Sequence, residues 1–129
     1  MADLGPAEWL VNAWLAATFN PAAPFSIPGV YLQLHTGLPG AAGTANALAD
    51  TDRQPVAFSA ADDGTITTAG AAAEYLIGDD GTVTHGSLWT ALESGTWFWN
   101  VIATHPVTVV EGDVLTLSDG LTFTLDGWV

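Results

Sequence analysis

Carboxylates and histidines are the residues of this sequence that could bind a metal ion. Two Asp-Asp-Gly segments, residues 62–64 and 79–81, place carboxylates side by side, but neither has the Glu that an EF-hand loop needs at its twelfth position. Asp-Gly pairs are also typical of hairpin turns, and we interpret both segments as turns. His35, His85 and His105 fall in different predicted strands or strand ends, without a partner at ligand spacing. We therefore expect no metal and no cofactor.

Serine or carboxylate catalysis has equally little support. Ser59, Ser87 and Ser94 all lack the Gly-x-Ser-x-Gly context of a nucleophile elbow. Spacing does not exclude a glycosidase pair of carboxylates, because such pairs meet only in three dimensions, but a chain of 129 residues offers little room for a deep cleft. The chain has no Cys, which excludes disulfides and thiolate ligands. The sequence predicts that the protein is not an enzyme.

The six tryptophans allow two interpretations. Trp97 and Trp99 alternate within one apolar run, so they are expected on the same face of a strand. There they could stack on a sugar ring, together with Trp89 and Trp128. Alternatively they fill the core or a protein interface, where Trp is favoured, and this is the interpretation we prefer.

Charge is sparse and one-sided. Arg53 faces fourteen Asp and Glu residues, there is no Lys, and the net charge is −13. A nucleic-acid partner is not expected, because phosphate binding needs clustered Lys or Arg, and an anionic membrane surface is disfavoured for the same reason. The apolar run 9–19 is too short to span a bilayer, and the sequence predicts a leaderless, soluble chain. Arg53 can be an ordinary solvated side chain, but we predict a structural pair with Asp50, the alternative partner being Asp52.

The elements that must position these residues are one helix and many short strands. The sequence predicts a helix over 7–19, whose Leu10 and Trp14 share a face that packs either on its own sheet or on another subunit. A proline-rich connection runs to residue 29, and a long loop covers 37–52. The expected strands are 30–35, 53–59, 65–68, 72–77, 82–89, 96–104, 106–110, 114–118 and 121–125.

This order predicts a mainly β fold, an antiparallel β-sandwich of the jelly-roll or Ig-like kind with one short N-terminal helix. We expect a single domain overall, in which 1–29 form the helix and connection and 30–129 form the sandwich. The run 96–104 is apolar almost throughout, so its strand is expected to be covered on both faces.

Four segments, in order, resemble a known family. Residues 31–40 read Tyr-Leu-Gln-Leu-His-Thr-Gly-Leu-Pro-Gly and are followed by Gly-Thr-Ala-Asn at 43–46. Arg-Gln-Pro-Val-Ala-Phe follows at 53–58, Thr-His-Gly-Ser-Leu-Trp at 84–89, and a Glu-Gly-Asp turn with an alternating strand at 111–125. The pattern is similar to that of small tail-fibre-like virion proteins of tailed phages. Here Ala47-Leu48 replaces the Glu-Val that often follows the family's Asn, and the Trp97–Trp99 run is unusually aromatic.

The resemblance implies a non-enzymatic, oligomeric virion component. Because the chain shows no fibrous repeat and no coiled-coil heptads, the first expectation is a capsid decoration (cement) protein on the capsid lattice. A tail fibre or minor tail protein is the alternative, and a small carbohydrate-binding adhesion module is a third. Expected partners are capsid or tail proteins of the phage and copies of the chain itself, such as a trimer. The predicted interface residues are Trp9, Trp14, Gly37, Pro39, Ala42, Asn46, Trp97 and Trp99.

Overall fold

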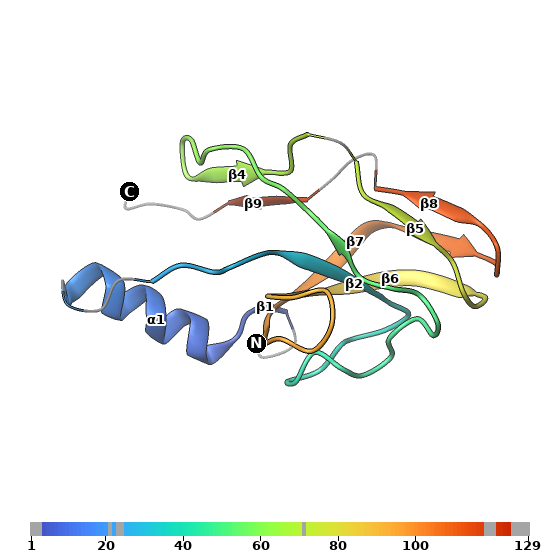
Figure 1. Ribbon diagram of the computed structural model, residues 1–129, viewed down its shortest axis with the longest axis horizontal. Coiled ribbons are helices and arrows are strands. Elements are labelled where there is room, and N and C mark those ends of the chain that lie inside the picture. The colour runs from blue at the N-terminus through green and yellow to red at the C-terminus, as the bar shows by residue number, and fades with distance from the viewer. Residues whose placement is uncertain (1–3, 21, 23–24, 71, 118–120, 125–129) are drawn as a thin grey trace.

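The computed structural model describes residues 4–20, 22, 25–70, 72–117 and 121–124. Its main sheet has five antiparallel strands in the order β1-β7-β6-β2-β3. Two ribbons, β4-β9 and β5-β8, form a second layer over this sheet, and the N-terminal helix lies at one end (Figure 1). The arrangement confirms a β-sandwich with one short helix. The bounds are β1 Gly5–Pro6, α1 Glu8–Phe19, β2 Tyr31–His35, β3 Gln54–Pro55, β4 Thr65–Thr67, β5 Glu74–Leu76, β6 Gly81–Trp89, β7 Trp97–Val109, β8 Val114–Thr116 and β9 Thr122–Thr124.

The core lies between the two layers. The sheet contributes Leu32, Leu88 and Phe98, and β5 covers them with Tyr75, which is fully buried. The hydroxyl of Tyr75 donates to the carbonyl of Leu32 at 2.9 Å, so the one polar atom of that side chain is satisfied where it enters the core. Burial raises the pKa of this phenol above its usual value.

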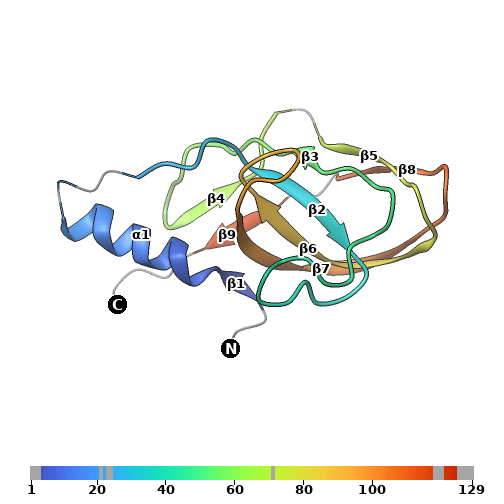
Figure 2. The same ribbon diagram turned by 60° about the horizontal axis from the view of Figure 1, so that its bottom comes forward.

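The helix forms where the sequence predicts it and packs on its own sheet. Leu10 is buried, and Trp14, one turn further, packs against Trp99 with ring centroids 5.7 Å apart. The opposite side remains open, since Leu15 is 53% and Phe19 79% exposed. Figure 2 shows the helix running away from the sheet beyond β1. The helix is therefore anchored through one face, near its N-terminal half.

Three predictions about the elements need correction. Residues 96–104 and 106–110 were expected as separate strands but form the single strand β7. Between Val83 and His85 of β6 the partner on β7 changes from Val107 to Ile102, so β7 carries extra residues there. This bulge accommodates Pro106, which has no N–H for the ladder.

The other two corrections concern burial and the N-terminus. β7 is not covered along its whole length, because Ile102 is 59% exposed. Gly5 and Pro6, expected at a helix start, pair instead with Asn100 and Trp99 as strand β1. The division at residue 29 stays a prediction, although β1 joins the sheet that the rest of the chain builds.

Candidate functional site

Hydrogen bonds hold the loop between β2 and β3 against the sandwich. The carbonyl of Asn46 accepts from the backbone N–H of Thr36 at 2.8 Å, and the side-chain amide of Asn46 donates to the carbonyl of Leu38 at 3.0 Å. Asn46 has φ 58°, a left-handed conformation that Asn tolerates better than most residues. The side chain of Asn100 in β7 donates to the carbonyl of Gly40 at 2.8 Å. The loop is an ordered part of the domain.

Hydrogen bonds of a buried histidine also hold this loop to the sheet. His35 is fully buried, with Nδ1 2.7 Å from the carbonyl of Ala45 and Nε2 2.7 Å from Oγ of Ser87. A carbonyl can only accept, so Nδ1 carries the hydrogen and Nε2 accepts from the Ser87 hydroxyl. Trp89 Nε1 donates to the same hydroxyl oxygen at 2.7 Å. Every polar atom of this chain of contacts is thereby satisfied.

The environment of His35 favours its neutral form. Burial lowers the pKa of the imidazole below its ordinary value of 6.5, and the charges of His85 and Arg53 act in the same direction, while the contact with Ala45 opposes them. A neutral, fully buried histidine between a carbonyl and a serine is a structural group. The groups of three or more His, Cys, Asp or Glu side chains that could hold a metal are absent from the described residues.

The predicted interface tryptophans are engaged inside the chain. Trp97 donates from Nε1 to Oδ1 of Asn100 at 2.8 Å, and its indole lies where a side chain on Gly43 would stand. Trp99 instead packs between Trp14 and Phe123, at 5.7 and 4.8 Å.

Trp97 and Trp99 also do not follow the regular alternation of a strand. Leu88 pairs with Trp99, whereas the next residue of β6 pairs with Trp97, so the pairing of the strands shifts between them. Trp97 and Trp99 therefore have different surroundings and form no shared, flat face of the kind that sugar stacking would need. Trp128, the fourth member of that hypothetical platform, lies outside the described residues.

The other predicted interface residues differ in exposure. Ala42 and Asn46 are exposed on the loop, and Gly37 is half-buried. Pro39 is fully buried, so it shapes the loop from within. Trp9 is 37% exposed and is held by a hydrogen bond from Nε1 to the carbonyl of Trp97 at 2.8 Å. Exposed atoms that could meet a partner thus remain at Ala42, Asn46 and Trp9.

Arg53 has partners that the sequence did not indicate. Its Nη1 donates to the carbonyls of Ala91 and Ser94, at 2.9 and 2.7 Å, and its guanidinium carbon lies 4.0 Å from the ring centroid of Trp89. These contacts fix the turn between β6 and β7. They involve neutral acceptors and an aromatic ring, where the sequence suggested the carboxylate of Asp50.

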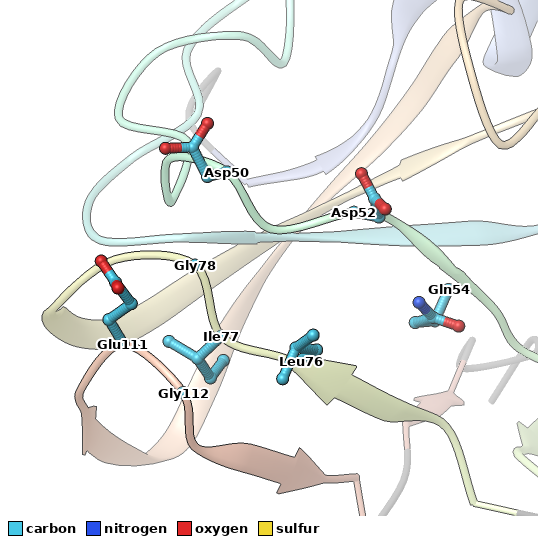
Figure 3. Close-up of a pocket in the computed structure, with 8 residues that line it drawn as sticks. All are labelled: Asp50, Asp52, Gln54, Leu76, Ile77, Gly78, Glu111 and Gly112. Atoms are coloured by element: carbon cyan, nitrogen blue, oxygen red, sulfur yellow. The ribbon is translucent and has the colours of Figure 1, made fainter.

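A pocket of about 290 Å³ is lined in part by β5, which lies at the opposite end of the domain from α1 (Figure 1). Its lining comes from three segments of the chain, and it opens between the end of the long loop, β5 and the turn before β8 (Figure 3). Leu76 and the buried Ile77 contribute the apolar part, and Asp50, Asp52 and Glu111 contribute carboxylates. No sequence pattern indicates this pocket, because its residues meet only in the folded chain.

Comparison with known families agrees with this architecture. The family model described as Podophage GP4 fiber I protein gp80 matches residues 5–124, which include the helix and every strand that the structure describes. The chain belongs to this family, a structural family of phage tail-fibre-like proteins. No curated protein gave a match. None of the helices in the described part of the chain is long and apolar enough to span a membrane.

Proposed function

We propose that the protein is a small, non-enzymatic fibre-type subunit on the exterior of a podophage virion. The observation that carries this proposal is the family match over residues 5–124, which covers the described helix and strands and not an isolated motif. The fold agrees with a structural role, because the polar groups deepest in the domain, those of His35, Ser87 and Asn100, hold elements together. A fibre-type subunit of this kind binds other virion proteins.

The N-terminal helix and the long loop are the proposed contact regions toward neighbouring subunits. Leu15 and Phe19 offer an open apolar side of α1, and Ala42 and Asn46 are exposed on the loop. A helix of twelve residues is marginal without packing, so a neighbour on its open side would stabilise it further. Copies of the chain, for instance in a trimer, are the proposed neighbours here.

Capsid decoration is a second candidate. It is supported by the sandwich itself, because the strands that the structure describes show no repeated unit that would extend into a shaft. A decoration protein and a fibre subunit differ in number and position on the particle. Immunogold labelling, with quantitative mass spectrometry of purified virions, separates them. A few copies at the tail support the fibre, hundreds of copies over the head support decoration, and absence from purified particles overturns both.

A further inference from the structure

The outer face of the β5-β8 ribbon carries an exposed apolar pair. Leu76 and Val114 are directly opposed in the ladder, so their side chains lie on the same face as neighbours. Their exposed fractions are 68% and 61%, whereas the alternate residue Tyr75 points into the core and is fully buried. Val110, at the other end of the turn that leads into β8, is 50% exposed. Three aliphatic side chains thus face solvent at one end of the domain.

This apolar face continues into the acidic pocket. Leu76 belongs to both, and Glu111 and Gly112 of the turn line the pocket beside it. The turn is fixed from two sides, because Oδ1 of Asp80 accepts from the backbone N–H of Glu111 at 2.9 Å and Oδ2 of Asp113 accepts from that of Val110 at 3.0 Å. The pocket and the apolar pair therefore form one preorganised surface, which we call the ribbon surface: Asp50, Asp52, Leu76, Val110, Glu111 and Val114.

The charge of the ribbon surface is not balanced within the chain. Arg53 is the only Lys or Arg of the sequence, and it is held over Trp89 and on the carbonyls of Ala91 and Ser94. The carboxylates come from separate segments and are spread around the pocket, without converging on one point (Figure 3). Their spread suits several contacts with a larger partner better than one small ion.

We infer that the ribbon surface is a docking site for another virion protein, one that presents an apolar side chain flanked by Lys or Arg. The apolar residue would cover Leu76 and Val114, and the cations would face Asp50, Asp52 and Glu111. A second copy fits less well, because two chains of net charge −13 would bring the same acidic rim together. This inference rests on the proposed virion function and names the chemistry of the partner.

The experiment measures binding of purified protein to phage particles produced without it, by co-sedimentation at low and at high NaCl. Leu76→Gln and Val114→Thr should each weaken binding about tenfold, since both remove apolar contact at the centre of the surface. The double variant Asp52→Asn/Glu111→Gln should also weaken binding and should flatten its dependence on NaCl. Leu92→Gln, in the turn between β6 and β7, is the matched control for an exposed leucine outside the proposed contact regions and should bind these particles like the wild type.

The outcomes separate the two proposals. If the wild type does not bind such particles at all, the virion function fails and this inference fails with it. If the wild type binds and the ribbon variants bind equally well, only the ribbon surface is excluded. Sedimentation velocity adds a further test, because loss of self-association in Leu76→Gln with unchanged particle binding would assign the surface to a second copy and overturn the inference. Thermal melts of each variant show that any loss of binding occurs in a folded chain.

Discussion

At the scale of single residues, buried side-chain hydrogen bonds hold the long loop in place. The network of His35, Ser87 and Trp89 has one hydrogen-bond arrangement in which every donor meets an acceptor. Such networks tolerate loss of a member poorly, because the remaining polar groups stay buried without a partner.

Replacing Ser87 by alanine is expected to destabilise the fold by about 1–3 kcal/mol. The change leaves His35 Nε2 without a donor and Trp89 Nε1 without an acceptor, both in the interior. Urea unfolding, followed by tryptophan fluorescence, measures the difference. Ser26→Ala, at an exposed position, is the control and should unfold like the wild type. Equal midpoints for Ser87→Ala and wild type would show that the network contributes nothing.

Acid should destabilise the fold through His35. Because burial depresses the pKa of folded His35 below 6.5, its stabilisation is complete above pH 6.5, where the imidazole is neutral in both states. Below pH 6.5 the unfolded chain takes up a proton that the folded chain does not, so stability falls by up to about 1.4 kcal/mol per pH unit, until folded His35 is protonated too.

The measurement is urea unfolding from pH 8 to pH 5, for wild type and His35→Gln. The variant should lose the histidine part of the pH dependence, whereas His105→Gln, at an exposed position, should keep it. NMR titration of the histidine ring protons provides an independent readout. A ring signal of His35 that titrates at or above 6.5 would contradict the assignment.

At the scale of elements, the loop is positioned where its backbone lies directly against a side chain of the sheet. Gly43 has φ 71° and lies against the indole of Trp97, so a side chain there meets both backbone strain and overlap with the ring. Gly40 has a similar φ of 79°, but the nearest atom to an added methyl group is Cβ of Ala45 at 3.8 Å.

Gly43→Ala should therefore cost clearly more than Gly40→Ala. Backbone strain is worth about 1–2 kcal/mol in both, and overpacking adds about 1–3 kcal/mol only at Gly43. Chemical unfolding of the two variants gives the difference, and the near-UV circular dichroism of tryptophan reports whether Trp97 moves. Equal stabilities would mean that the indole yields at no cost.

The two sides of α1 should respond very differently to truncation. Leu10 is 1% exposed and anchors the helix, so Leu10→Ala should destabilise the protein by about 2–5 kcal/mol. Leu15→Ala removes a side chain that is mostly in solvent and should change stability by less than about 0.5 kcal/mol in the isolated chain. Thermal unfolding of both variants tests this. Similar losses for the two would show that the outer side of the helix is packed in solution.

Local patterns predicted the elements well and their partners poorly. The apolar period gave the helix, and alternation gave β2 and β6, because these signals lie within one segment. The division of β7 was wrong, since a bulge that tolerates Pro106 depends on the register with β6. The contacts of Arg53 with Ala91 and Ser94 join residues far apart in the sequence, so no local pattern indicates them, and the pair with Asp50 stays a prediction. Asn100 is the exception, because a single amide within an apolar run indicates a buried polar contact from the sequence alone.

At the scale of the whole molecule, acidic charge works against compaction. Fourteen acidic residues on a small domain repel one another, and this repulsion is stronger in the folded chain, where they are closer together. Added salt screens the repulsion, because the Debye length falls from about 30 Å at 0.01 M to about 8 Å at 0.15 M.

The melting temperature should therefore rise by a few degrees when NaCl is increased from about 0.01 to 0.15 M. Differential scanning calorimetry at pH 7.5 measures the shift. An equal osmolality of glycerol is the control for effects that do not depend on charge. A melting temperature that is flat or falls with NaCl would show that attractive pairs outweigh the repulsion.

The contacts of Arg53 also affect how readily trypsin can cleave the protein. Trypsin cleaves after Lys or Arg, and this sequence offers it one bond, between Arg53 and Gln54. In the folded chain Arg53 is half-buried with its guanidinium over Trp89, and Gln54 pairs with Leu32 of β2, so cleavage requires local opening of this edge of the sheet. The domain therefore offers trypsin little to cut while it remains folded. The contacts that let Arg53 fix a turn thus also protect the one tryptic site of the sequence.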